Sequence, residues 1–288
     1  MINGPVAAAK ALTQYVSLDT PPKRLVDVLR LMIEGENGVD SASAIEITEK
    51  WKKRFEGRVR YELSEAENDG IPLNYSFNSA NPEYVQGACF IEGSDSDAIR
   101  SEKNARAKQE EYFSFYDELT PNMFERLCGK ILELFDVEES YVTRASADQG
   151  VDFFGRLPFG TLLKPKDIPA GAEKQLAVWL VGQAKHYLKT SVSTKDIREL
   201  VGSVILARSK TYAGNSDPLK DLEIRVCDPV VFLFLTTGKF TRDSRDLLRR
   251  SGVVAMDGVQ LGIFLADHLA GQDDGELSVG ALRKWLSE

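Results

Sequence analysis

Two short apolar runs, Leu176–Val181 and Val230–Leu235, most restrict what this chain can fold into. Both fall well short of the roughly 20 consecutive apolar residues that a membrane-spanning helix needs. Their length fits β-strands, and fully apolar strands are typical of a sheet that helices cover on both faces. We therefore predict that both runs are buried strands of a soluble protein that does not enter the membrane.

The order of elements after residue 119 points to an α/β fold with a mixed central sheet flanked by helices. Thr120-Pro121 begins a predicted helix, with apolar residues at helical spacing. Strands at 141–145, 151–157 and 175–185 follow, then a helix capped by Ser193 or Thr194. The last elements are a strand at 230–235, a helix at 242–250, a strand at 253–256 and a helix after residue 258. Consecutive strands followed by strand–helix alternation favour this architecture.

Residues 1–118 are predicted to form a separate, mainly helical (α+β) domain. A helix is expected over Ser43–Phe55, whereas residues 61–93 mix strand-like pieces with Asn, Pro and Gly. The polar stretch from about 95 to 118 favours a linker helix, which places the boundary near residue 118. Trp51, among the basic residues Lys50 to Arg54, indicates either a DNA-contacting element or an amphipathic core helix. The role of this domain stays open between target recognition, regulation and partner binding.

The formal net charge of −8 argues at first sight against nucleic acid as a partner. The charge is unevenly distributed, however, because residues 1–118 carry 14 Lys and Arg against 21 Asp and Glu, whereas residues 153–225 carry 12 against 7. A locally positive surface is sufficient to bind phosphates. The 3 cysteines are too few for a disulfide framework, and the N-terminus lacks the features of a signal peptide, so we expect a cytoplasmic protein.

One strand ends in a group of residues suited to phosphate chemistry. Side chains alternate along a strand, so Gln183 and Lys185 point to one face while Ala184 points into the core. Asp152 lies in a second strand, which brings it to the same end of the sheet if the two strands are neighbours. Oxygen ligands of this kind hold Mg²⁺, and a lysine beside them can orient or deprotonate a water. The residues therefore predict a metal-assisted phosphodiester hydrolase.

A fourth acidic group and a set of cations fit the same site. Glu125 lies at the border of the apolar stripe of the helix after Thr120, from where it could reach the sheet edge. The other reading of Glu125 is an acid that stabilises the first helical turn. Three cations close to the site in sequence favour contact with a nucleic-acid backbone: Lys189, Lys195 and Arg198.

Taken together, the segments FERLCGKIL, ADQGVDFFG, GQAKHY, STKDIRELVG and VFLFLTTGKF resemble the catalytic domain of Mrr-type restriction endonucleases, within the PD-(D/E)xK nuclease superfamily. The resemblance covers about residues 119–270 and implies a restriction-endonuclease-like fold for a nuclease domain at 119–288. It implies that Asp152 is the motif aspartate, Lys185 the motif lysine and Glu125 the acid of the first core helix. Gln183 occupies the usual Glu position, as in the QxK variant of this group. The missing charge weakens metal binding unless Glu125 contributes.

The expected function is a Mg²⁺-dependent endonuclease, with Mn²⁺ as an alternative metal, that cleaves DNA in restriction or another defence against foreign DNA. Two alternatives stay open: a binding module that keeps the nuclease fold without activity, and a repair or junction-processing nuclease. Cutting both strands usually takes two active sites, so a homodimer is expected. The N-terminal part could also bind a second protein subunit.

Overall fold

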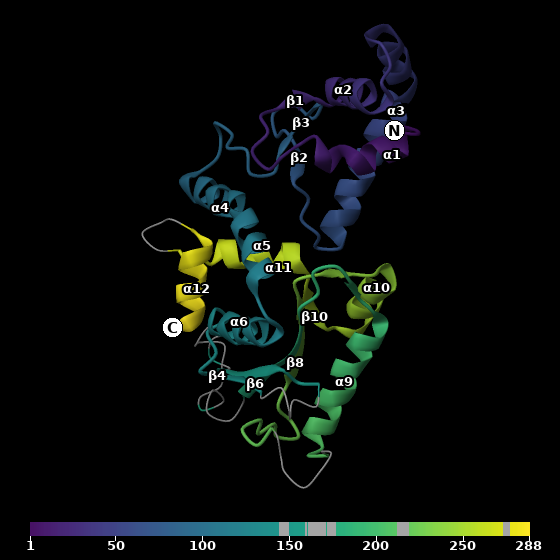
Figure 1. Ribbon diagram of the computed structural model, residues 1–288. Helices are drawn as coiled ribbons and strands as arrows, with labels where there is room; N and C mark the ends of the chain where they lie inside the picture. The colour runs from purple at the N-terminus through teal and green to yellow at the C-terminus, as the bar shows by residue number, and fades with distance from the viewer. Residues whose placement is uncertain (144–149, 159, 161–170, 172–176, 212–218, 273–276) are drawn as a thin grey trace. The chain divides into compact units, whose positions relative to one another are not determined.

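The computed structural model describes residues 1–143, 150–158, 160, 171, 177–211, 219–272 and 277–288 (Figure 1). The chain divides into two compact units, Met1–Lys108 and Gln109–Glu288. The division lies earlier than the predicted boundary near residue 118, and the polar stretch forms two helices, α4 (Asp97–Ala107) and α5 (Gln109–Glu118). Helix α5 belongs to the second unit because its aromatic residues Tyr112, Phe115 and Tyr116 are buried in the core of that unit.

The first unit is mainly helical, with a small sheet. It contains α1 (Pro5–Ala11), a 3-10 helix (Leu12–Gln14), β1 (Lys23–Arg24), α2 (Leu25–Asn37), α3 (Ser41–Asn68), β2 (Tyr75–Phe77), β3 (Tyr84–Gly87) and α4. The strands pair antiparallel in the order β1-β3-β2. Asp40 caps α3 by accepting a hydrogen bond from the backbone N–H of Ser43 at 2.9 Å. Helix α3 continues well beyond the predicted end at Phe55.

The second unit contains the predicted mixed sheet, with five strands in the order β10-β8-β6-β5-β4. Strands β4 (Glu139–Val142), β5 (Phe153–Pro158) and β6 (Ala177–Lys185) pair antiparallel, whereas β6, β8 (Val230–Thr236) and β10 (Val254–Met256) run parallel. Two further strands, β7 (Ser191–Val192) and β9 (Lys239–Phe240), form a short parallel pair. The sequence also indicates a polar insertion at 158–174 and a tight turn at Asp148 and Gln149. Both fall almost entirely outside the described residues.

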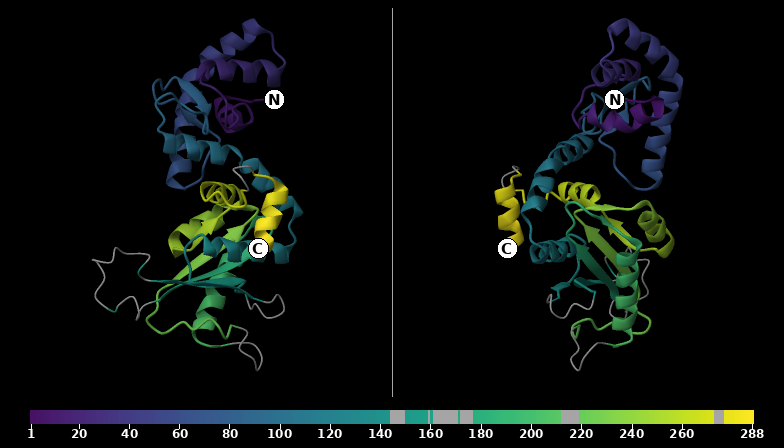
Figure 2. Two further views of the ribbon diagram at one scale, coloured as in Figure 1. Left: turned by 90° about the vertical axis from the view of Figure 1, so that its left-hand side faces the viewer. Right: turned by 45° about the vertical axis from the view of Figure 1, so that its right-hand side comes forward.

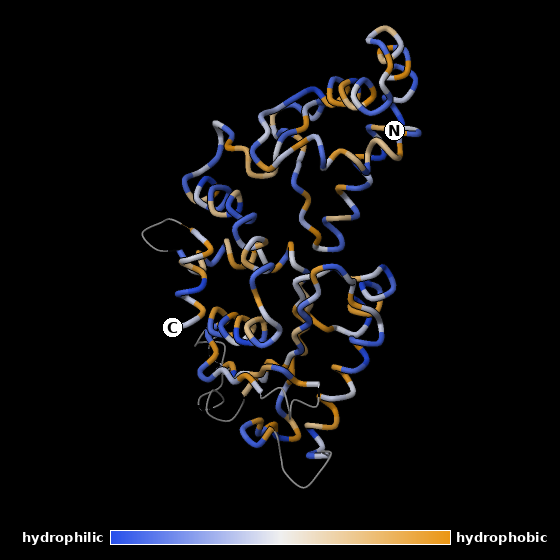
Figure 3. Tube along the Cα trace, in the orientation of Figure 1, coloured by the Kyte–Doolittle hydropathy of each residue, from blue (hydrophilic) through white to orange (hydrophobic). Residues whose placement is uncertain are grey.

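Helices cover both faces of this sheet, as the two apolar runs predicted. Helices α5, α6 (Pro121–Glu133), α11 (Gly258–Asp267) and α12 (Val279–Ser287) share one core with one face of the sheet. Helices α9 (Thr194–Arg208) and α10 (Arg242–Ser251) share a second core with the other face. Figures 1 and 2 show α6 and α9 on opposite sides of the strands, and Figure 3 shows the hydrophobic residues along β6 and β8. Among the described residues, no helix is both long and apolar enough to cross a membrane.

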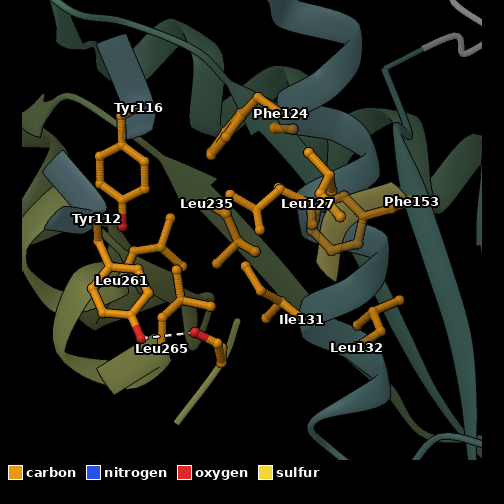
Figure 4. Close-up of a cluster of buried hydrophobic side chains, with 14 of the residues drawn as sticks. Tyr112, Tyr116, Phe124, Leu127, Ile131, Leu132, Phe153, Leu235, Leu261 and Leu265 are labelled. Carbon is orange, nitrogen blue, oxygen red and sulfur yellow. Dashed lines mark hydrogen bonds between the residues drawn. The ribbon is translucent and has the colours of Figure 1, made fainter. Parts of the chain in front are cut away.

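The core on the α6 side fixes the position of β5. Figure 4 shows the ring of Phe153 beside Leu127 and Ile131 of α6. Thr120 begins this helix by accepting a hydrogen bond from the N–H of Met123 at 3.3 Å, and Pro121 occupies the first turn. On the α5 side, the Tyr112 hydroxyl donates to the carbonyl oxygen of Ala270 at 2.9 Å.

A buried carboxylate stabilises the start of β8 and gives a pH-dependent prediction. The Arg225 guanidinium donates to both oxygens of Asp228, which is 3% exposed, and lowers the pKa of that carboxyl. A depressed folded-state pKa contributes stability above the unfolded pKa, and this contribution is lost as the pH falls through the folded pKa. We expect Asp228→Asn to lower the free energy of unfolding by about 1–2 kcal/mol at pH 7. Denaturant unfolding at decreasing pH should show the difference from wild type narrowing, whereas Asp221→Asn, at an exposed position, should change little.

Candidate active site

Asp152 immediately precedes β5, at the end of the sheet where β6 finishes. The register of β5 against β6 pairs Phe153 with Gly182, and the Asp152 N–H donates to the Gly182 carbonyl at 3.0 Å. The side chain is 5% exposed, and its Oδ2 accepts a hydrogen bond of 2.7 Å from the N–H of Ala184. The predicted pairing of these two segments is therefore confirmed, and the carboxylate lies against the backbone between Gln183 and Lys185.

Gln183 and Lys185 project from β6 toward the face that α9 covers. Trp179 and Val181, at alternate positions before them, belong to the core shared with α9, whereas Ala184 belongs to the core shared with α6. Gln183 is 1% exposed, and within the described part of the chain its Oε1 has no hydrogen-bond partner. A buried carbonyl oxygen without a partner is costly, so this atom marks a place where a ligand would be favoured.

Two threonines that the sequence did not single out hold the backbone around these residues. Thr143 donates its N–H to the carbonyl of Asp152 at 2.9 Å and its hydroxyl to the carbonyl of Val151 at 2.7 Å. Thr236, which is fully buried, donates its hydroxyl to the carbonyl of Lys185 at 2.7 Å. Thr236 is a polar residue at the end of the apolar strand β8, and this contrast in the sequence could have identified it as a residue near the site.

Glu125 lies on the opposite side of the sheet from Gln183 and Lys185, because α6 packs on the other face. Burial raises the pKa of the Cys128 thiol of α6 well above its usual range, and the charges of Asp152 and Glu125 raise it further. The structure therefore brings Asp152 to the strand of Gln183 and Lys185, whereas Glu125 lies on the helix that covers the other face.

Of the residues that follow Lys185, His186 packs against its neighbours, whereas the cations further along the chain are exposed at the surface. His186 lies 5.7 Å from Phe124 between ring centroids, its Nδ1 is 3.0 Å from the Thr237 hydroxyl, and burial lowers its pKa. His186 is therefore a packed residue. Lys189 is exposed in the segment after β6, and Lys195 and Arg198 are exposed on the first turns of α9. Ser193 caps α9 through a hydrogen-bonded box with Asp196.

The donor set fits a hard divalent cation better than a zinc-type centre. Among the described residues, no group of three or more His, Cys, Asp and Glu side chains could hold a metal. Carboxylate and amide oxygens, the donors that Asp152, Gln183 and Glu125 carry, are the kind of ligand that Mg²⁺ and Mn²⁺ prefer. The unpartnered Gln183 Oε1 beside a buried carboxylate is consistent with such an ion.

Comparison with protein families gives a match in the region that carries these residues. Residues 116–213 match the Mrr_cat family, described as a restriction endonuclease. The match begins just before α6 and extends past α9, so it includes Glu125, Asp152, Gln183 and Lys185. The resemblance predicted from the sequence is confirmed. A comparison with curated proteins gives no match.

Two solved structures are also similar to this chain. One is the MspJI restriction endonuclease in complex with a 27-mer oligonucleotide, at 21% identity and a TM-score of 0.42, which covers 69% of this chain and 40% of the other. The second is the DNA modification-dependent restriction endonuclease AspBHI, at 17% identity and a TM-score of 0.38, which covers 73% of this chain and 46% of the other. The chain spans less than half the length of either protein.

Proposed function

We propose that this chain is a metal-dependent endonuclease that hydrolyses phosphodiester bonds in DNA. The observation that carries the proposal is the buried carbonyl oxygen of Gln183, which has no hydrogen-bond partner among the described residues. It lies on the strand in which the Ala184 N–H donates to the Asp152 carboxylate. Within the described residues this is an unsatisfied acceptor next to a buried acid, which a cation would satisfy. The match of residues 116–213 to a restriction endonuclease family supports phosphodiester hydrolysis as the reaction.

Lys185 supplies the proton chemistry and part of the charge stabilisation in this proposal. Its side chain shares a face of β6 with Gln183, and its backbone is fixed by the Thr236 hydroxyl. From there the amine orients the attacking water, or accepts its proton, and stabilises the negative charge that develops on the phosphate.

Asp152, Gln183 and Glu125 are the residues that would hold the metal, which we propose is Mg²⁺, with Mn²⁺ as a substitute. When bound, the divalent cation supplies Lewis-acid polarisation of a phosphate oxygen. Gln183 contributes no charge, so the proposal requires the Glu125 carboxylate to reach past the start of β5 from the α6 side of the sheet and complete the site. Lys189, Lys195 and Arg198 would hold the DNA backbone on the surface next to it.

The setting we infer is a restriction or other defence role in the cytoplasm of a prokaryote. Cleavage of both strands would use two copies of the chain as a homodimer, and the unit Met1–Lys108 would recognise the target, regulate cleavage or bind a second protein.

A plasmid assay tests the proposal. Supercoiled DNA incubated with the protein and Mg²⁺ or Mn²⁺ is expected to become nicked or linear, and EDTA should abolish the reaction. Gels that resolve the three plasmid forms give the rate. If neither DNA nor RNA is cleaved above background with either metal, the chain is an inactive nuclease-fold binding module. Faster cleavage of branched than of linear or modified substrates would instead indicate a junction-processing nuclease.

A further inference from the structure

The outward face of helix α3 carries a row of cations that the proposed active site does not use. Five residues of α3 lie on one side of the helix, because each is three or four positions from another member of the set. We call them the α3 stripe: Lys50, Lys53, Arg54, Gly57 and Tyr61. All five are exposed. Trp51 lies toward the core side, where it packs on the hydrophobic cluster of the first unit. The basic segment and the core contact are therefore on different faces of one helix.

The cations of the stripe differ from the other cations of α3, which are paired. Lys52 forms an ion pair with Glu49 at 2.5 Å, and Arg60 forms one with Glu56 at 2.9 Å. In the described residues, no carboxylate lies within ion-pair distance of Lys50, Lys53 or Arg54. Residues 50–60 hold 6 of the 14 Lys and Arg of Met1–Lys108, against a single acidic residue. An otherwise acidic unit thus concentrates its positive charge in about three turns of one helix.

Gly57 lies in the middle of the stripe and inside a helix of 28 residues. A glycine destabilises a helix interior relative to alanine. A β-carbon built at Gly57 meets no atom within 4 Å, so no neighbouring group requires its absence. Because Gly57 has no side chain, the helix backbone between Lys53, Arg54 and Tyr61 can be approached closely by a bound molecule.

We propose that the α3 stripe binds the sugar–phosphate backbone of duplex DNA, at a contact separate from the active site. Phosphates complement the three cations of the stripe, Lys50, Lys53 and Arg54. The Arg58 guanidinium lies 4.6 Å from the centroid of the Tyr61 ring, and its charge is paired with Glu62. The contact reads no base sequence, because it addresses only the backbone. This inference rests on the proposed function in taking DNA as the substrate.

The first test measures binding of the full chain to a fluorescein-labelled duplex in EDTA, over a range of salt concentrations. Lys50→Ala/Lys53→Ala/Arg54→Ala is expected to lower the affinity about tenfold or more and to reduce the salt slope by about 2.7, since each phosphate contact contributes about 0.9. The matched control, Lys10→Ala/Lys52→Ala/Arg60→Ala, removes the same charge from the same unit. An unchanged slope in the stripe variant, or an equal change in the control, overturns the proposal.

The second test uses Gly57, for which stability and binding should change in opposite directions. Gly57→Ala should raise the midpoint of thermal unfolding by a few degrees and yet weaken DNA binding. Gly35→Ala, in helix α2, also places its β-carbon in open space and should raise the midpoint without changing the affinity. A Gly57→Ala variant that binds DNA as tightly as wild type contradicts the close approach of the backbone.

These measurements separate the α3 contact from the nuclease proposal, because binding in EDTA does not depend on cleavage. If the wild type cleaves DNA and the stripe variant binds normally, the α3 contact is wrong and the nuclease proposal stands. If the wild type cleaves no DNA but the stripe variant loses salt-dependent binding, the nuclease proposal is wrong and the α3 contact stands. Unlabelled polyglutamate is a further competitor of the labelled duplex. If it displaces the duplex as well as unlabelled DNA does at equal charge, the stripe binds polyanions in general, and the proposal that it binds DNA is overturned.

Discussion

Replacing Lys185 by alanine is expected to slow DNA cleavage by about 10²–10⁴-fold, the range in which a positioned proton-transfer group contributes. The lysine is at the end of β6, on the face of Gln183, and the proposal assigns proton transfer to no other residue. The folded state should be little affected, because the side chain is only half-buried and has no ion-pair partner among the described residues. Single-turnover nicking of plasmid DNA at saturating protein would measure the loss.

A matched control for this variant is Lys239→Ala, which removes an exposed lysine from the end of another strand, β9. It changes the net charge equally and should leave the cleavage rate within a few-fold of wild type. Denaturant unfolding of both variants would establish that the fold is intact. Wild-type cleavage by Lys185→Ala would show that the active site lies elsewhere in the chain.

The orientation of residues within one element could be predicted from the sequence. Alternation along β6 placed Ala184 in the core opposite Gln183 and Lys185, and the structure confirms it, because Ala184 packs with α6. The sequence placed Asp152 at the same end of the sheet on the condition that its strand neighbours β6, and the structure meets that condition. The orientation within β6 depends only on local periodicity.

The positions of elements relative to one another were harder to predict. Helical spacing located Glu125 at the border of the apolar stripe of α6, but it did not tell which face of the sheet α6 would cover. That face is decided by long-range packing, in which α6 shares a core with α11 and α12. The division between the units lies earlier than the predicted boundary for a similar reason. The sequence of α5 is largely polar, and only the packing of this helix against α11 and α12 shows that Tyr112 and Tyr116 are core residues.

Gly182→Ala is expected to lower the free energy of unfolding by about 1–3 kcal/mol, the usual cost of adding a group to a packed core. A β-carbon at position 182 would lie 2.2 Å from the ring of Phe153, its cross-strand partner, which is fully buried. The ring cannot move away freely, because Leu127 and Ile131 of α6 surround it (Figure 4). Denaturant unfolding measures this loss. Since Asp152 is bonded to Phe153, displacing the ring should also slow cleavage.

Two further variants distinguish this steric cause from a general effect of adding a methyl group. Gly202→Ala, in α9, adds the same group where no atom lies within 4 Å, and it should stabilise the protein by about 0.5–1 kcal/mol. Gly182→Ala/Phe153→Leu removes ring atoms that the new methyl group would meet, so it should lose less stability than the sum of the two single changes. Strict additivity would contradict the steric account. Recovery of cleavage together with stability in the double variant would mean that the Gly182–Phe153 contact sets the position of Asp152, and that the active site depends on the closeness of these two strands.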